Sequence, residues 1–387
     1  MNPITLFGIA TFAIALGWAM GTPLPFGVAV AVLVSVIFVW ITVNRVDGAL
    51  KSGRELEKTL VAAGSVIAMR VSVSAQGAFR FCWLELQDSV PEGAQVRGSS
   101  ATFVVGMLQA GAKWMYLTEL TRRGVYRFGP IRVRYGDLLG VHARSLESEE
   151  HTDIYVHPRI FPLTNMNLPS HRPFGDLRTN AMAFEDPTRP AGTREYRQGD
   201  SLKRIHWTAT ARAMRLIAKE YDGSIVPIGT IAIDRNPQNY ANLDDYELAF
   251  SIAASLLVSG TYFGYDIGIQ LESSLAPGRG ELHIEKALTM LASTSRTEDT
   301  LAQQLATIRT SLSWRGTLIL ITSHLPTDVA ALLDIFRHSG HAVSVAVVGK
   351  DARADVALGA ASNVCTAVAQ VRNEEEISAL HFITLRY

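Results

Sequence analysis

The side chains of this chain that could do chemistry are concentrated in one stretch, GTREYRQGDSLKRIHWTATAR, at positions 192–212. Glu195, Asp200 and His206 are its acid and base groups, and such groups can move protons in a hydrolase. No nucleophile elbow, phosphate-binding glycine loop or HExxH zinc motif accompanies them. We therefore expect no catalytic residues and no enzymatic activity, and we keep a hydrolase that uses these three groups as an alternative.

A second hypothesis for the same stretch is the binding of an anionic partner. Basic residues outnumber Glu195 and Asp200 here; they are Arg189, Arg194, Arg197, Lys203, Arg204, Arg212, Arg215 and Lys219. Such an excess could contact phosphate, an anionic lipid or polymer, or an acidic protein surface. The whole chain has 36 Lys and Arg against 36 Asp and Glu, so we expect no nucleic-acid partner.

The third hypothesis, which we favour, is a structural role that can coexist with binding. Gly199 and Asp200 would form a turn, with Asp200 as the N-cap of a short helix. Ile205 and Trp207 would then face the core. Arg204 and Arg212 would pair with nearby carboxylates such as Glu195, because buried charges are tolerated only when they are paired. The stretch would lock a connector to the domain that follows it.

Two apolar runs without a charged residue, at 4–20 and 26–43, precede everything else. Each is near the length that crosses a bilayer as a helix, so residues 1–44 predict a transmembrane hairpin. A buried pair of soluble helices is the alternative. Arg45, Lys51, Arg54 and Lys58 follow the second run, and by the positive-inside rule the remaining chain faces the cytoplasm. We thus expect a two-pass protein of the bacterial inner membrane.

Residues 45–163 show short runs of period-two alternation separated by turn residues, which predicts an antiparallel β sandwich. Within it, residues 120–142 are typical of a hairpin with Gly129 and Pro130 at the turn. Its arginines, which we expect on a solvated face, are Arg122, Arg123, Arg127, Arg132 and Arg134.

Residues 164–222 predict an extended connector that ends in the chemistry-bearing stretch. From 223 to 387 apolar strands alternate with amphipathic helices, which predicts a three-layer α/β domain with a mostly parallel sheet. We expect SNVCTAVAQV to be its last strand.

Open parallel sheets bind ligands at the carboxyl ends of their strands. The candidate ligands for Mg²⁺ there are Asp234, Asn236, Gln238 and Ser323. They include one carboxylate, so we expect no metal or other cofactor and interpret Asp234 as a residue that caps a loop.

The central motif resembles the signature of the domain-of-unknown-function family fifty-eight, DUF58. It consists of Gly192, Arg194, Glu195, Tyr196, Gly199, Asp200, Arg204, Ile205, Trp207, Ala211 and Arg212. The strand-like stretches RGVYRFGPIRVRYGDLLGV and YVHPRIFPL are also similar to elements that precede the signature in that family. The resemblance implies a C-terminal domain like von Willebrand factor type A, in which Asp234 alone matches the metal-binding loop.

What the resemblance implies about function is a partnership. Members of the family are typically encoded beside MoxR-type AAA+ ATPases and membrane proteins. This chain would then be a membrane-anchored adaptor, facing the cytoplasm, for such an ATPase and for other membrane proteins, in assembly or in an envelope or stress function.

Overall fold

The computed structural model describes residues 3–47, 50–75, 82–98, 101–105, 111–137, 143–169, 185–197, 200–223, 228–308 and 316–385. The chain divides into two compact units. The first unit is Met1–Ile160 with Leu288–Thr294, and the second is Phe161–Ala287 with Ser295–Tyr387.

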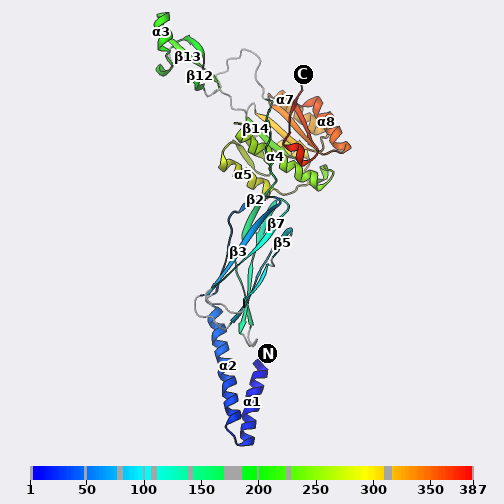
Figure 1. Ribbon diagram of the computed structural model, residues 1–387. Coiled ribbons are helices and arrows are strands. Elements are labelled where there is room, and N and C mark those ends of the chain that lie inside the picture. Colours follow the sequence, from blue (N-terminus) through cyan, green and yellow to red (C-terminus); the bar gives the residue numbers. More distant parts are fainter. Residues whose placement is uncertain are drawn as a thin grey trace. The chain divides into compact units, whose positions relative to one another are not determined.

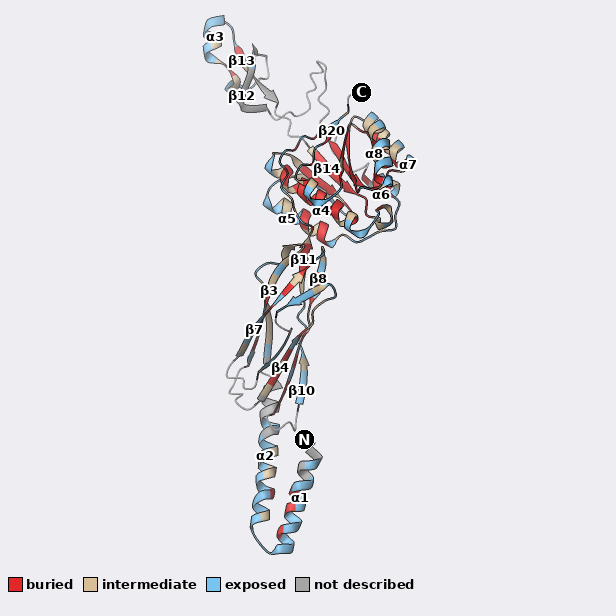
Figure 2. Ribbon diagram, turned by 45° about the vertical axis from the view of Figure 1, so that its right-hand side comes forward, coloured by how far each residue is buried: buried red, intermediate tan, exposed pale blue. Residues whose placement is uncertain are grey.

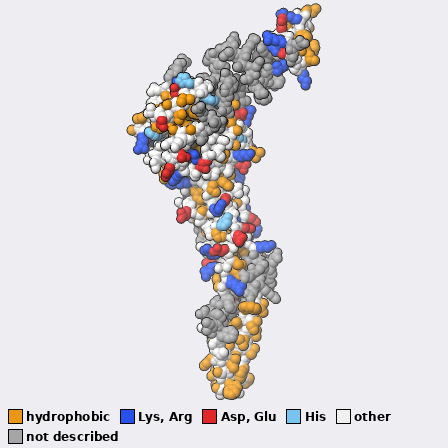
Figure 3. Space-filling view, turned by 180° about the vertical axis from the view of Figure 1, so that it is seen from behind, with side chains coloured by type: hydrophobic (Ala, Val, Ile, Leu, Met, Phe, Trp, Pro, Cys, Tyr) orange, Lys and Arg blue, Asp and Glu red, His pale blue; other side chains and the backbone are white. Residues whose placement is uncertain are grey.

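The chain begins with two helices, α1 (Pro3–Met20) and α2 (Leu24–Asp47) (Figure 1). Their side chains are mainly apolar, and many of them are exposed (Figure 3). Pro23 lies in the turn between them.

None of the helices in the described part of the chain is long and apolar enough to cross a membrane. A crossing helix needs about 20 consecutive, predominantly apolar residues. Helix α1 has 18 residues, and the last turn of α2 contains Asn44, Arg45 and Asp47. The predicted transmembrane hairpin at 1–44 and the predicted two-pass inner-membrane location were therefore wrong.

The described residues of the first unit then form eleven strands in three sheets. One sheet has the order β1 (Leu50–Glu55), β3 (Ser65–Ala75), β7 (Gly111–Leu120), β5 (Ala94–Arg97). The second has the order β10 (Ala143–Glu147), β9 (Ile131–Asp137), β4 (Cys82–Asp88), β6 (Thr102–Val105). The third has the order β2 (Leu60–Ala62), β11 (Thr152–His157), β8 (Gly124–Phe128).

The predicted fold class was wrong in its description of these sheets as well as in its membrane helices. Strand β11 runs parallel to β2 and antiparallel to β8, so the third sheet is mixed. The alternation along a strand reports which side is buried but not the direction of the neighbouring strand. In β9, for example, Ile131, Val133 and Tyr135 are buried while Arg132 and Arg134 are exposed.

The predicted hairpin over 120–142 was also wrong. Strands β8 and β9 belong to different sheets, and β9 pairs with β4 and β10. Gly129 and Pro130, joined by a cis peptide bond, connect the two sheets. Gly129 has a φ of 105°, and a Cβ there would lie 2.7 Å from the carbonyl oxygen of Glu150. A glycine is therefore required at this crossing.

Three arginines of this segment lie on the solvated face that we predicted. Each forms an exposed ion pair with a carboxylate of a neighbouring strand: Arg127 with Asp153, Arg132 with Glu147, and Arg134 with Glu85. Exposed pairs of this kind contribute about 0–1 kcal/mol each to stability.

A buried polar network crosses the core of the first unit. The Arg54 side chain is 2% exposed and the Asp88 side chain 0%, and the two form a bidentate ion pair. Arg54 also donates to the Phe128 carbonyl oxygen at 3.1 Å and to Thr152 Oγ1 at 2.9 Å. The Tyr116 hydroxyl donates to Asp88 Oδ2 at 2.6 Å, and burial, followed by the Asp88 charge, raises the pKa of Tyr116.

The second unit contains a seven-stranded sheet. Its order is β16 (Ser274–Gly278), β15 (Asp266–Gln270), β14 (Ile228–Ile233), β17 (Thr317–Thr322), β18 (Ala342–Val348), β19 (Ala367–Val371), β20 (Ile383–Thr384). The five inner strands are parallel, and the edge strands β16 and β20 are antiparallel to their neighbours. Every residue of β17 and β18 is buried (Figure 2).

Helices cover both faces of this sheet. They include α4 (Leu243–Tyr262), α6 (Leu301–Ile308), α7 (Thr327–His338) and α8 (Ala352–Val364), with the short helix α9 (Glu374–Ile377) beside α4 and β19. Helix α5 (Glu281–Ser293) is divided between the two units. Side chains of α6, α7 and α8 share one core cluster with Leu318, Leu320 and Val345. Helix α4 packs on the opposite face, where Gly260 leaves space for Ile267.

Two expectations about local structure in this unit were wrong. The prediction that SNVCTAVAQV forms one strand missed α8, whose last residues are Ser362, Asn363 and Val364, before β19 begins at Ala367. Its alanine-rich sequence has little contrast between the two faces of the helix. The end of the predicted connector is strand β12 (Glu185–Glu195), which pairs with β13 (Ile217–Gly223).

The Arg54 network generates a prediction about stability. Arg54→Ala leaves the Asp88 carboxylate buried without its ion-pair partner, which costs about 3–5 kcal/mol. Arg127→Ala breaks an exposed pair and costs less than about 1 kcal/mol. Hydrogen exchange of the β3 and β7 amides in the full chain measures both variants, and similar losses in the two would contradict the assigned role of the network.

Candidate functional site

The polar residues of positions 192–212 lie in a small substructure that we call the signature module, residues 185–197 and 200–223. Its base is the antiparallel pair of β12 and β13, in which Arg194 is opposite Ala218 and Glu195 is opposite Ile217. The chain then returns across this pair. Ile205 forms a β-bridge with Ala218, and the amide of His206 donates to the Ile217 carbonyl oxygen at 2.8 Å.

Among the residues of the module whose side chains are described, Ile205, Ile217 and Ala218 are buried. The prediction that Ile205 faces a core is confirmed. Polar interactions also hold the module together.

The main polar interaction joins Arg194 to Asp200. The guanidinium donates through Nη1 to Oδ2 at 2.7 Å and through Nη2 to Oδ1 at 2.8 Å. The Arg197 amide donates to the same Oδ2 at 2.9 Å, and the Tyr196 hydroxyl donates to the Asp200 carbonyl oxygen at 3.1 Å. The hydrogen bonds from Arg194, followed by the one from Arg197, lower the pKa of Asp200 to about 2.

Asp200 is therefore a loop residue, and its prediction as a helix N-cap was wrong. A short 3₁₀ turn, Leu202–Arg204, intervenes before helix α3 (Trp207–Ala213). His206 caps α3, because its Nδ1 accepts a hydrogen bond from the Ala209 amide at 3.2 Å. Because this turn places the start of α3 at Trp207, the imidazole of His206 occupies the N-cap position.

The prediction that Glu195 pairs with Arg204 or Arg212 was wrong. Glu195 forms its ion pair with Arg215, and both side chains are more than half exposed. Arg204 lies close enough to Asp200 to help lower the pKa of that carboxyl group, after the larger effects of Arg194 and Arg197. Arg212 is exposed in the last turn of α3.

The three acid and base groups of the hydrolase alternative thus have separate structural partners. Asp200 binds Arg194, Glu195 binds Arg215, and the His206 Nδ1 caps α3. Gly192 is an exposed residue of β12, and Gly199 lies outside the described residues.

An unexpected feature of the module is its exposed apolar side chains. Trp207 is 67% exposed, so the prediction that it faces a core was wrong. Leu202 is 69% exposed and Met214 is 91% exposed. Lys and Arg side chains lie beside apolar ones on this part of the surface (Figure 3). Leu202 and Met214 were not singled out from the sequence, although large apolar residues next to so many charged ones were a usable signal.

A second group of candidate residues lies at the carboxyl edge of the seven-stranded sheet. Asp234 follows β14 and is completely buried. Its Oδ1 accepts from the Asn236 amide at 3.1 Å, and its Oδ2 accepts from Asn239 Nδ2 at 2.8 Å and Thr322 Oγ1 at 3.1 Å. Burial raises the pKa of Asp234, and these hydrogen bonds oppose the rise.

The other residues of the degenerate metal loop do not join Asp234 in a ligand set. Asn236 Oδ1 accepts from the Gln238 amide at 3.0 Å and caps a 3₁₀ turn. Thr322 faces Asp234, whereas Ser323, the next residue, lies near Gly349. No group of three or more His, Cys, Asp or Glu side chains suited to a metal was found in the described ranges.

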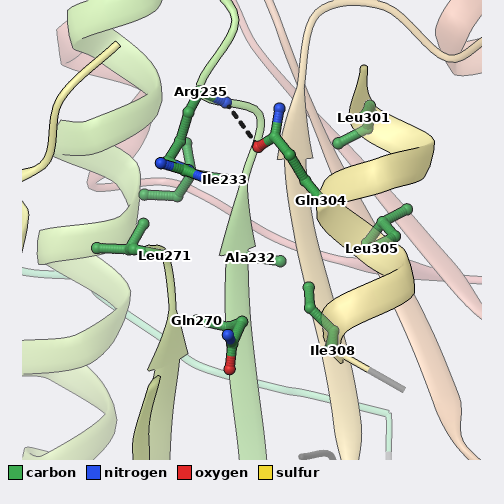
Figure 4. Close-up of a pocket in the computed structure, with 9 residues that line it drawn as sticks. All are labelled: Ala232, Ile233, Arg235, Gln270, Leu271, Leu301, Gln304, Leu305 and Ile308. Carbon is green, nitrogen blue, oxygen red and sulfur yellow. Dashed lines mark hydrogen bonds between the residues drawn. The ribbon is translucent and has the colours of Figure 1, made fainter. Parts of the chain in front are cut away.

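A cavity of about 10 Å³ lies beside this edge, between β14, β15 and α6 (Figure 4). Arg235 and Gln304 are at its mouth, where the Arg235 amide donates to Gln304 Oε1 at 3.2 Å. Most of the other lining residues are apolar. The space is about that of one water molecule, too small for a substrate.

The low pKa of Asp200 generates a prediction about pH. The carboxylate form is stabilised in the folded module, so its contribution is complete above about pH 4 and is lost as pH falls through about 2. NMR titration of the Arg197 amide should therefore show a step near pH 2. Asp200→Asn should abolish that step, while Asp328→Asn, at an exposed position of α7, should leave it unchanged. A step near pH 4 in the unaltered chain would contradict the assigned hydrogen bonds.

Comparisons with known proteins agree with the motif. Residues 192–365 match the family described as "Protein of unknown function DUF58". The chain is 24% identical over 250 residues to the uncharacterized protein YeaD of Bacillus subtilis (strain 168). That match covers 62% of this chain, and the chain spans about 62% of the length of this relative.

Several solved structures show weak similarity. One is a complex of zinc 2-glycoprotein (ZAG) with prolactin inducible protein (PIP) from human seminal plasma. It is 8% identical, covers 28% of this chain and 93% of that chain, and has a TM-score of 0.22. Another is a CARDB domain from Pyrococcus furiosus, at 14% identity, 28% of this chain, 91% of that chain and a TM-score of 0.20. Structural similarity this weak supports no conclusion about the chain. The family match is more informative: residues 192–365, which begin at the first glycine of the motif, match the DUF58 family.

Proposed function

We propose that this chain is a non-enzymatic interaction protein whose signature module binds an acidic, partly apolar surface of a protein partner. A MoxR-type AAA+ ATPase is the partner that we expect. The observation that carries the proposal is the exposure of Leu202, Trp207 and Met214 on the module.

The apolar side chains support binding through their energetics. Burying a large apolar side chain at an interface contributes about 1.5–3 kcal/mol. Tryptophan is among the residues that most often dominate a binding interface. Trp207 begins α3 and Met214 follows its end, in a left-handed conformation with φ of 53°. Such a conformation is uncommon for a residue with a side chain, and it keeps Met214 out of the helix.

The charges of the module support an acidic partner. Arg197, Lys203 and Arg212 are exposed around the apolar side chains. Arg215 is exposed as well, although it pairs with Glu195. Complementary charges raise the rate of association and select among partners more than they raise affinity.

The Arg194–Asp200 pair supports binding indirectly, because it holds the loop that precedes Leu202. A surface that is already ordered loses less conformational entropy when it binds. In this proposal the motif residues Arg194, Tyr196 and Asp200 position the surface, and Leu202, Trp207 and Met214 contact the partner.

The expected identity of the partner rests on the resemblance to the DUF58 family, whose members are typically encoded beside MoxR-type ATPases. A likeness of the second unit to the von Willebrand factor type A domain belongs to the same proposal. It is supported by the five parallel inner strands with helices on both faces.

Binding of the purified full chain to the MoxR-type ATPase of the same source tests the proposal. The double variant Trp207→Ala, Met214→Ala should weaken binding on the order of tenfold or more, as expected for interface residues of this size. The matched control is Leu282→Ala, Val356→Ala, which removes two other exposed apolar side chains of the second unit. The control should bind as the unaltered chain does.

The possible outcomes test the identity of the partner and the location of the binding surface separately. If no binding occurs, the ATPase is not the partner. If both double variants bind equally well or equally poorly, the module is not the binding surface. Binding of a polyanion that falls steeply with salt and is insensitive to Trp207→Ala would favour recognition of an anionic polymer instead.

A further inference from the structure

Three side-chain oxygens lie close to Gly349 at the carboxyl edge of the seven-stranded sheet. The position that a Cβ would occupy on Gly349 lies 3.5 Å from Ser323 Oγ, 3.6 Å from Asp245 Oδ2 and 3.6 Å from Asp351 Oδ1. The three residues come from the loop after β17, the first turn of α4 and the loop after β18. Parallel strands bring these loops to the same edge.

The backbone of Gly349 fixes the turn that brings these residues together. Its φ is 109°, a region that residues with a side chain rarely adopt. Its amide donates to the Val371 carbonyl oxygen at 2.9 Å, so the turn is held against β19.

Ser323 has no other evident reason to be polar. It is completely buried, and its Oγ has no hydrogen-bond partner among the described residues. A buried hydroxyl group without a partner costs about 1–3 kcal/mol relative to a satisfied one. Its neighbour Thr322 is fully engaged with Asp234 and His324. The hydroxyl group of Ser323 is therefore available to a ligand in the space beside Gly349.

The two carboxylates have local roles that account for part of their presence. Asp351 Oδ1 accepts from the Ala354 amide at 3.1 Å and caps α8. Asp245 Oδ2 accepts from Asn242 Nδ2 at 3.0 Å in the first turn of α4. These single hydrogen bonds leave acceptor capacity on both carboxylates, since each oxygen of a carboxylate has two lone pairs.

The surrounding charges favour a cation in this space. The negative charges of Asp351 and Asp244 act on the Asp245 carboxylate, and the exposed ammonium of Lys350 opposes them. Two carboxylates that destabilise each other are stabilised together when a positive ion lies between them.

We propose that Asp245, Asp351 and Ser323 form a binding site for a hard divalent cation such as Mg²⁺ or Mn²⁺. Magnesium typically binds proteins through one or two carboxylates and keeps several of its waters, so two carboxylates and a hydroxyl are a sufficient set. The site differs from the Asp234 loop, whose carboxylate is occupied by hydrogen bonds. The bound ion links the loops after β17 and β18 to α4.

Titration of the full chain, stripped of metal with a chelator, tests the site directly. Mn²⁺ binding, followed by electron paramagnetic resonance, should show one site per chain. Asp245→Asn and Asp351→Asn should each weaken it on the order of tenfold or more. Asn is also a good N-cap, so Asp351→Asn should keep α8 intact. Asp328→Asn, an exposed acid in the first turn of α7, is the matched control and should bind normally.

Two further measurements test the proposed cation site independently. Mg²⁺ should raise the unfolding temperature of the unaltered chain and not of Asp245→Asn, because a ligand stabilises the state that binds it. Lys350→Met should tighten Mn²⁺ binding, since it removes a competing positive charge. Absence of Mn²⁺ binding at about 10 mM, or binding that is the same in Asp245→Asn, Asp351→Asn and Asp328→Asn, would overturn the proposal. None of these results depends on the partner of the signature module.

Discussion

The burial of the central strands is the constraint on which the second unit depends. Every side chain of β17 and β18 is buried, as are all but the first of β14, so helices must cover both faces of the sheet. Polar groups then gather where the strands end. Asp234 is the clearest case, because its buried carboxylate accepts hydrogen bonds from Asn236, Asn239 and Thr322 and so ties β14 to β17.

The polar residues at this edge differ in how far the protein satisfies them. The Asp234 carboxylate accepts hydrogen bonds from Asn236, Asn239 and Thr322. Ser323 is buried to the same extent, but its Oγ has no partner among the described residues. This difference distinguishes Asp234, which ties two strands together, from Ser323, which belongs to the proposed cation site.

The signature module depends on a polar interaction. Among its described side chains Ile205, Ile217 and Ala218 are buried, and the bidentate Arg194–Asp200 pair joins β12 to the residues before Leu202. Charge-assisted hydrogen bonds of this type are stronger than neutral ones. Trp207 and Met214 lie exposed on the surface of the same module. Arg194 and Asp200 therefore hold the chain in position next to these exposed apolar side chains.

The sequence by itself determined the local elements that have a strong pattern. The run GTLILITS predicted β17 and TDVAALLDIFRHSG predicted α7, because fully apolar strands and amphipathic helices are readable without neighbours. The motif also predicted the family match of residues 192–365. Alternation in β9 showed which of its residues are buried. It could not show that β8 and β9 lie in different sheets, since strand pairing is a long-range choice.

Tertiary structure decided which charges meet. From the sequence, Arg204 and Arg212 were as plausible for Glu195 as Arg215, and the strand pairing of β12 with β13 made the selection. The exposure of Trp207 depended on a 3₁₀ turn that moved the start of α3. Asp245, Ser323, Gly349 and Asp351 are spread over the chain from position 245 to position 351. They meet because parallel strands place their carboxyl ends at one edge of the sheet. The sequence pattern does not specify which strands are neighbours in the sheet.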